Sequence, residues 1–150
     1  MVYLKDSKIK IERPAEVAKM FLGLLAGEDA LERDKEHFYV AHLNIRNRVN
    51  MVELVTLGTL TDSLVSPRET FRRAIMQGSA AIIVGHNHPS GEVEPSDEDT
   101  KVTTLLFEAG RILGIELLDH IIFSQIGFFS FKDNKAWERR ERGWVRHAEL

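Results

Sequence analysis

The fold is decided by residues 80–99, which read AAIIVGHNHPSGEVEPSDED. The apolar run from Ala80 to Val84 has no polar alternation, which is typical of a central strand covered on both faces. It leads directly into His86 and His88, whose side chains point to the same side of an extended chain, about 7 Å apart along it. A Pro-Ser-Gly turn follows, and Ser96 then begins a helical pattern. The two histidines therefore meet the start of a helix at a strand end, where α/β sheets bind their ligands.

The helix that follows supplies a third candidate metal ligand, Asp99. Two neutral imidazoles and one carboxylate are a ligand set for zinc that leaves the fourth position for water. The alternative is that Asp99 only caps its helix, because Ser-x-x-Asp is a capping box and acidic first turns favour the helix dipole. With His86 and His88 at the same helix start, we favour a shared metal. The chain has no cysteine, so any metal ligand must be His, Asp or Glu.

Glu53 is the one charge on an otherwise apolar face of the predicted strand 49–57. The other residues of that face are Val49, Met51, Val55 and Leu57. An unpaired buried carboxylate costs several kcal/mol, roughly 3–5 kcal/mol when a buried pair is broken. In the structural interpretation, this face is solvated near one end or an arginine such as Arg68 pairs with Glu53. In the functional interpretation, Glu53 faces a dry cleft, where burial raises its pKa and it can move protons beside a metal. The residues alone leave both interpretations open.

The flanking sequence predicts helices and strands in an order typical of an α/β protein. Helical apolar spacing runs from Pro14 to near Gly27, and Ser66 and Ser96 are the N-caps of two further helices. We expect strands over residues 37–45, 49–57, 80–84, 115–123 and 127–131, a short hairpin over residues 2–11, and a charged helical segment over residues 134–150. This order predicts an α-β-α sandwich around a mixed sheet.

Length, composition and charge narrow the class of protein. A chain of 150 residues with 43% hydrophobic content is large enough for one globular domain with its own core. A net charge of −3 and a pI near 6.1 argue against a protein dominated by binding to phosphate backbones. No stretch approaches 18 consecutive apolar residues, and the N-terminus does not resemble a signal peptide. We therefore expect a cytoplasmic protein without membrane association.

Taken together, Glu53, His86, His88, Ser96 and Asp99 resemble the JAMM signature of the JAB/MPN metalloprotease domains. The surrounding residues resemble the RadC family within that group: Ser-Pro-Arg-Glu at 66–69, His-Asn-His-Pro-Ser-Gly at 86–91, Pro-Ser at 95–96 and Asp-His-Ile-Ile at 119–122. The resemblance covers residues 38–131. It implies one JAB/MPN domain over residues 1–150, with the cytidine-deaminase-like architecture, an N-terminal hairpin and helix over residues 1–35 and a C-terminal tail over residues 134–150.

The resemblance also implies a role for each site residue. His86, His88 and Asp99 would bind Zn²⁺. Glu53 would hydrogen-bond the zinc-bound water and act as general base, and Ser96 would donate to the oxyanion. The expected function is therefore that of a zinc metallopeptidase that hydrolyses amide or isopeptide bonds in a protein or peptide substrate, because zinc lowers the pKa of its water from about 15.7 towards 7.

A nucleic-acid role is the first alternative, through the DNA-repair association of the RadC family. Longer members that this chain resembles carry an N-terminal helix-hairpin-helix region, whereas only a short hairpin and helix precede the core here, which weakens that expectation. The letters His-Asn-His resemble HNH nucleases only superficially. Arginines near the C-terminus alternate with glutamates, as on a solvated helix face: Arg139, Arg140, Arg142 and Arg146. Zinc deamination of nucleosides would require a Pro-Cys-x-x-Cys motif, which a chain without cysteine lacks.

A partner-binding module without catalysis is the second alternative. Every motif position of the resemblance is present, which argues against a degenerate site. Trp137 and Trp144 nevertheless lie on one stripe of the predicted C-terminal helix. That stripe is a candidate contact for a homo-oligomer, and the favoured alternative is that it packs on its own domain.

Overall fold

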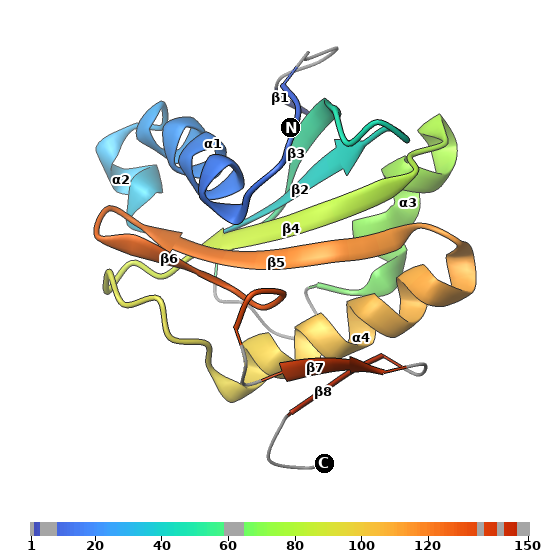
Figure 1. Cartoon of the computed structure of the whole chain (residues 1–150). Coiled ribbons are helices and arrows are strands. Elements are labelled where there is room, and N and C mark those ends of the chain that lie inside the picture. Colours follow the sequence, from blue (N-terminus) through green and yellow to red (C-terminus); the bar gives the residue numbers. More distant parts are fainter. Residues whose placement is uncertain (1, 4–8, 59–64, 135–136, 141–142, 147–150) are drawn as a thin grey trace.

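The computed structural model describes residues 2–3, 9–58, 65–134, 137–140 and 143–146, the last two ranges by their backbone alone. Six strands form one mixed sheet in the order β1-β3-β2-β4-β5-β6 (Figure 1). Their bounds are β1 Val2–Tyr3, β2 His37–Leu43, β3 Val49–Leu57, β4 Ala81–Asn87, β5 Glu116–Ser124 and β6 Gly127–Ser130. In this sheet β4 and β5 pair in parallel, and the other neighbours are antiparallel.

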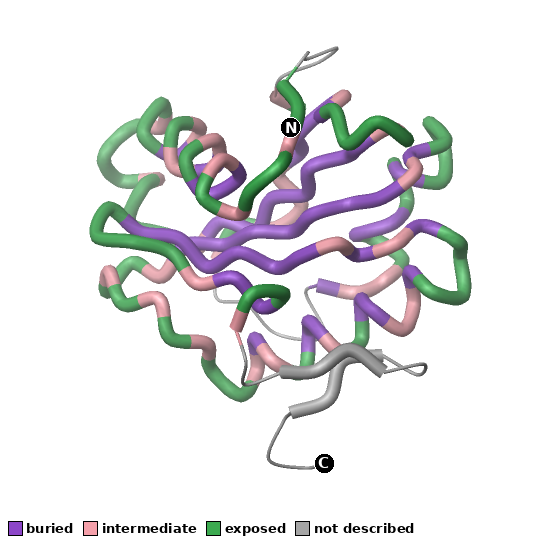
Figure 2. Tube along the Cα trace, in the orientation of Figure 1, coloured by how far each residue is buried: buried purple, intermediate pink, exposed green. Residues whose placement is uncertain are grey.

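Helices cover both faces of the sheet, so the predicted α-β-α sandwich is confirmed. Helix α1 (Pro14–Ala26), with the short α2 (Ala30–Arg33) beside it, lies on one face, and α3 (Pro67–Gln77) and α4 (Asp97–Leu113) lie on the other (Figure 1). Each face has its own apolar core, one around Phe21 and Tyr39, the other around Phe71 and Leu106. The central strands between them are buried along most of their length (Figure 2). No helix in the described ranges is long and apolar enough to cross a membrane.

The predicted starts of α3 and α4 at Ser66 and Ser96 are confirmed, and both ends of each helix are specified by local chemistry. Ser66 and Ser96 are the N-caps, and each hydroxyl oxygen accepts a hydrogen bond from the backbone N–H three residues later. Gly78 and Gly114 end the two helices at φ of 69° and 72°, in the left-handed region that favours glycine. The start of α4, which carries the candidate ligand, is therefore held in place by its own sequence.

Strand β4 extends beyond the apolar run that predicts it. The sequence predicts a strand over residues 80–84, whereas β4 continues to Asn87 and includes His86. The reason is tertiary: His86 lies opposite Phe38 of β2 on one side and opposite Ile122 of β5 on the other. Pairing on both sides keeps the polar end of this strand extended. His86 is consequently a buried residue of the sheet.

Two predictions at the termini are wrong. In the predicted C-terminal helix, the described residues form the antiparallel strands β7 (Trp137–Arg140) and β8 (Gly143–Arg146). Trp and Val favour strands, Gly disfavours a helix interior, and the spacing of the two tryptophans fits either structure. At the other end, β1 pairs with β3, and Lys10 bridges Arg48, in place of a hairpin within residues 2–11. The turn of that predicted hairpin lies outside the described residues. The side chains of the two tryptophans also lie outside them, so homo-oligomerisation through these tryptophans stays a prediction.

Candidate metal centre

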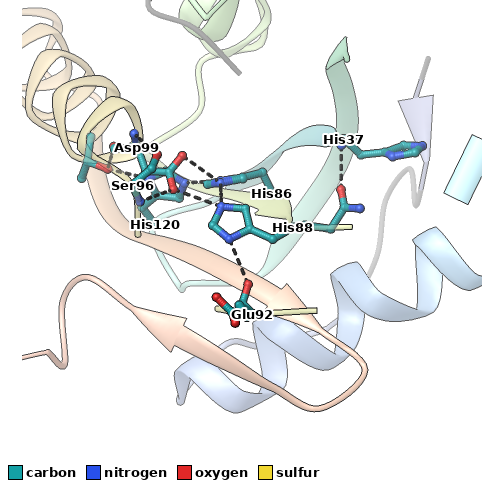
Figure 3. Close-up of polar contacts among 9 residues, drawn as sticks. His37, His86, His88, Glu92, Ser96, Asp99 and His120 are labelled. Atoms are coloured by element: carbon teal, nitrogen blue, oxygen red, sulfur yellow. Dashed lines mark hydrogen bonds and ion pairs between the residues drawn. The ribbon is translucent and has the colours of Figure 1, made fainter. Parts of the chain in front are cut away.

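His86, His88 and Asp99 converge on one point. His86 lies near the end of β4, His88 follows that strand, and Asp99 lies in the first turn of α4 (Figure 3). The two Nε2 atoms are 3.0 Å apart, and each lies 3.1 Å from an oxygen of the Asp99 carboxylate. One ligand atom of each residue lies within 4.8 Å of the others. The structure therefore brings together the three side chains that the sequence singles out.

The chemistry of these donors fits a divalent cation better than it fits hydrogen bonds alone. His88 Nδ1 lies 2.9 Å from the Glu92 carbonyl oxygen, an acceptor, so Nδ1 carries the proton and Nε2 of the neutral ring has a lone pair. That lone pair faces the Asp99 carboxylate and the Nε2 atom of His86. Lone pairs that face one another repel unless a positive charge lies among them. Two nitrogens and one carboxylate oxygen are a set of donors that zinc accepts.

The electrostatics of the cluster favour positive charge. Asp99 is 2% exposed, and burial by itself raises the pKa of its carboxyl. The contacts of the carboxylate with His86, His88 and the Ser96 backbone outweigh that effect and hold the pKa of Asp99 well below its usual range. The hydrogen bond to Asp99 raises the pKa of His88, and the charge of Glu36 raises it further. The carboxylate therefore stays ionised, and without a metal it draws a proton onto His88.

Ser96 and Asp99 form a capping box, and this places the carboxylate. The Ser96 hydroxyl oxygen accepts from the Asp99 N–H at 3.1 Å, and the Ser96 N–H donates to Asp99 Oδ2 at 2.8 Å. The two interpretations of Asp99 are therefore compatible, because the bonds that cap α4 also direct the carboxylate towards the histidines. Since the capping bond uses the Ser96 oxygen as an acceptor, it leaves the hydroxyl proton available to donate.

The structure does not bring Glu53 to this cluster. One carboxylate oxygen of Glu53 lies 2.9 Å from His42 Nε2 and the other lies 2.9 Å from Arg73 Nε. Burial by itself raises the pKa of Glu53. The two hydrogen bonds have the larger effect and lower the pKa below its usual value, so this carboxylate stays ionised. The arginine that pairs with Glu53 is therefore Arg73, and the expected example, Arg68, is wrong.

Strand register shows how far Glu53 is from the histidines. Glu53 lies opposite Val40 of β2, whereas His86 lies opposite Phe38, which itself pairs with Thr56. Glu53 is thus two strands from His86, about 10 Å across the sheet, and two residues of β2, about 7 Å, along it. It lines a separate cavity, together with Glu69, Arg72 and Arg73. The expectation that Glu53 lies within reach of the cluster is wrong.

A different carboxylate, Glu36, faces the candidate site. Glu36 is half-buried and immediately precedes β2. It lines a cavity of about 400 Å³ together with Pro89, Ser90, Glu98 and three residues of the predicted site, His88, Ser96 and Asp99. The sequence alone does not single out Glu36, because its approach to the site depends on β2 running antiparallel beside β4. That pairing places the start of one strand beside the end of the other. A charge just before a buried strand is the signal available in the sequence.

Asn87 fixes the segment that carries Glu36. Its side-chain oxygen accepts from the His37 N–H at 2.6 Å, and its side-chain nitrogen donates to the Lys35 carbonyl at 3.1 Å. The first of these bonds is drawn beside His37 in Figure 3. Asn87 is 3% exposed, and as the residue between the two histidines it points away from them. The residues on either side of Glu36 are therefore attached to the strand that carries His86.

Comparison with known proteins places the chain in a family. The family model of the RadC-like JAB domain matches residues 11–136. A UPF0758 protein of Chlorobium phaeovibrioides is 42% identical over 132 residues, which are 88% of this chain and 57% of that protein. A UPF0758 protein of Rubrobacter xylanophilus is 48% identical over 124 residues, 83% of this chain and 52% of that protein. The chain thus spans about half the length of these curated relatives. With a match over most of its length, this chain belongs to the RadC-like JAB domain family.

Proposed function

We propose that this domain is a zinc-dependent hydrolase that cleaves amide or isopeptide bonds in a protein or peptide substrate. The observation that carries the proposal is the convergence of His86 Nε2, His88 Nε2 and the Asp99 carboxylate beside a cavity that a further carboxylate lines. When bound to these three residues, zinc would act as a Lewis acid that polarises a carbonyl group and lowers the pKa of bound water towards neutrality. Everything else in the proposed reaction belongs to residues of the chain.

Glu36 is the proposed general base, in place of Glu53. Its carboxylate lines the same cavity as His88 and Asp99, and its charge acts on His88. A carboxylate in this position can accept a proton from the attacking water and return it to the leaving amine, and such catalysis contributes about 10²–10⁴-fold. The two hydrogen bonds of Asn87 to Lys35 and His37 support this role, because they hold Glu36 beside the cavity.

Ser96 is the proposed donor to the developing oxyanion. It lines the cavity beside Asp99, and its hydroxyl proton is not used by the capping bond. One donor aimed at an oxyanion contributes roughly 3 kcal/mol to transition-state stabilisation.

The lining of the cavity supports a peptide substrate over a phosphodiester. Glu36, Glu98 and Asp99 line it, and among the described lining residues there is no lysine or arginine. Such a field repels the phosphates of nucleic acids, which bind to basic surfaces. A neutral amide bond meets no such repulsion.

Metal analysis combined with turnover tests this proposal. We expect one zinc per chain in the purified protein and chelator-sensitive cleavage of a peptide or isopeptide library. Glu36→Gln is expected to retain the zinc and to lose turnover, whereas Glu53→Gln, the matched control in the other network, retains both. Normal cleavage by Glu36→Gln would exclude Glu36 as the base, and a wild-type protein that binds no zinc would exclude the function itself.

A further inference from the structure

A chain of hydrogen bonds lies behind His86, on the side of its ring that faces away from the candidate metal site. His86 Nδ1 lies 2.8 Å from His120 Nε2, and His120 Nδ1 lies 2.5 Å from Thr103 Oγ1. The Thr103 hydroxyl donates to the backbone carbonyl oxygen of Asp99 at 2.7 Å. The chain thus begins at one candidate ligand and ends on the backbone of another (Figure 3). His86, His120 and Thr103 are each at most 1% exposed, so water does not compete for these bonds.

The direction of every bond in this chain follows from its last acceptor. A carbonyl oxygen only accepts, so the single hydroxyl proton of Thr103 is used there and its oxygen must accept from His120 Nδ1–H. The neutral ring of His120 then has a lone pair on Nε2, which accepts from His86 Nδ1–H. His86 consequently has no proton on Nε2, the atom that faces Asp99 and His88.

The opposite direction would require Thr103 to give up its hydrogen bond to the Asp99 carbonyl, and it would block the site. If Thr103 donated to His120, the protons would shift along the chain and His86 would carry its proton on Nε2. That proton would be donated to Asp99 Oδ1, 3.1 Å away, and no lone pair of His86 would face the metal position. The alternative also gives up the hydrogen bond from the Thr103 hydroxyl to the Asp99 carbonyl, which then keeps only its partner within the helix.

We infer that His120 and Thr103 are positioning residues that keep the proton of His86 on Nδ1 and so present its Nε2 lone pair to a divalent metal. The inference deepens the metal site of the proposed function and rests on it. Histidines that bind metals commonly donate their second N–H to a fixed partner, and loss of such a partner lowers metal affinity about 10–100-fold. Here the partner is another histidine, which is itself directed by a hydroxyl group of the helix that carries Asp99.

The fold holds His120 where this role requires it. His120 lies opposite Val84 in the parallel pair of β4 and β5, and its ring stacks on Phe131 with 4.8 Å between centroids. The neighbouring Asp119 accepts from the His120 N–H, the Ser130 hydroxyl and the Lys132 N–H. These bonds attach β5 to the end of β6 and to the residues that follow it, and they support the position of His120 beside His86.

A competitive zinc titration of matched variants tests the inference. We expect His120→Leu, which removes the acceptor for His86 Nδ1–H, to weaken zinc binding about 10–100-fold. His120→Gln supplies an amide oxygen as acceptor and is expected to recover most of that affinity. The control is His42→Leu, the same change at a buried histidine that bonds Glu53 and Ser79, and it is expected to bind zinc as the wild type does. Equal affinity of His120→Leu and the wild type would overturn the inference.

Nitrogen NMR of the metal-free protein provides a readout that does not depend on zinc or on turnover. With ¹⁵N-labelled histidine we expect His86 to be protonated at Nδ1 in the wild type. Thr103→Val keeps the shape of the side chain but removes the hydroxyl, and it is expected to shift protonation of His86 towards Nε2. A wild-type His86 protonated at Nε2, or a Thr103→Val spectrum identical to the wild type, would refute the inference. A wild type with the expected spectrum but no zinc binding would instead refute the proposed function.

Discussion

Two clusters on the same face of the sheet each place a buried carboxylate against imidazole, but they differ in the source of the positive charge that the carboxylate meets. In one, the Glu53 carboxylate is bonded to His42 and to the guanidinium of Arg73. In the other, the Asp99 carboxylate faces the two imidazoles of His86 and His88. Arg73 satisfies the charge of Glu53 permanently, so the first cluster is complete without a ligand. An imidazole is neutral when it binds a metal, so the second cluster has a negative charge and free lone pairs for a cation.

The first prediction is that removing the carboxylate of the Asp99 cluster abolishes metal binding, whereas removing the carboxylate of the Glu53 cluster does not. Asp99→Asn removes an anionic ligand, and we expect zinc affinity to fall more than about 100-fold, beyond the effect of removing a supporting hydrogen bond. Cleavage activity is expected to disappear with the metal. Glu53→Gln, the matched change in the other cluster, is expected to retain wild-type affinity. Titration against a chromophoric chelator measures both, and equal losses would remove the distinction between the clusters.

The second prediction separates the two glutamates in catalysis. Glu36→Gln is expected to lower turnover of a cleaved peptide by about 10²–10⁴-fold at unchanged zinc content, because the amide cannot take up the proton of the attacking water. Glu53→Gln is expected to leave turnover within a few-fold of the wild type. Single-turnover kinetics on zinc-loaded protein check this, and the reverse result would assign the proton transfer to Glu53.

The third prediction uses the two N-cap serines as a matched pair. Ser66→Ala and Ser96→Ala each remove the cap of a helix and are expected to lower the free energy of unfolding by about 1 kcal/mol. Ser96→Ala is expected to lower turnover in addition, by about 10²–10³-fold, because its hydroxyl is the proposed oxyanion donor. Denaturation and kinetics on both variants decide the matter. If the two variants lose the same small amount of turnover, Ser96 acts only as a cap.

The fourth prediction concerns stability without metal. Glu53→Leu leaves His42 Nε2 and the Arg73 guanidinium without their partner, and we expect the free energy of unfolding to fall by about 1–3 kcal/mol. Zinc affinity is expected to stay unchanged, because the two clusters share no residue. Urea denaturation, with a double-mutant cycle that adds Arg73→Met, measures the coupling between the pair. A loss of zinc in Glu53→Leu would show that the clusters are connected.

The fifth and smallest effect is a pH dependence of the metal-free protein. The hydrogen bond to Asp99 raises the pKa of His88 above 6.5. A group whose pKa is higher in the folded than in the unfolded protein contributes its full stabilisation of the fold when the pH is below the unfolded-state pKa. This contribution is lost as the pH rises through the folded-state pKa. We therefore expect the thermal unfolding midpoint of the metal-free wild type to decrease as the pH rises beyond about 6.5, when it is compared with the midpoint of His88→Gln at the same pH.

Saturating zinc is expected to reverse that trend, because zinc binds the deprotonated imidazole and competes with protons at low pH. Thermal unfolding across pH, with and without zinc, measures the effect. Parallel curves for the wild type and His88→Gln in the metal-free state would show that Asp99 does not retain a proton on His88.

Much of the candidate site is predictable because its geometry is local. His86 and His88 share a side of the chain because side chains alternate along an extended strand, and Ser96 with Asp99 is a one-turn pattern at a helix start. The helix ends at Gly78 and Gly114 follow from backbone conformation at single residues. The C-terminal strands were missed because the spacing of Trp137 and Trp144 is compatible with a helix as well as with two strands.

The sequence by itself determined the three metal-ligand candidates, the two capped helices and the class of fold. Only the tertiary structure decided which glutamate faces the cluster and what His120 contacts. The physical reason is that the surroundings of a carboxylate or an imidazole are set by strands and helices distant in sequence. The antiparallel pairing of β2 with β4 places Glu36 beside His88, and helix α3 brings Arg73 to Glu53. The parallel pairing of β4 with β5 places His120 behind His86.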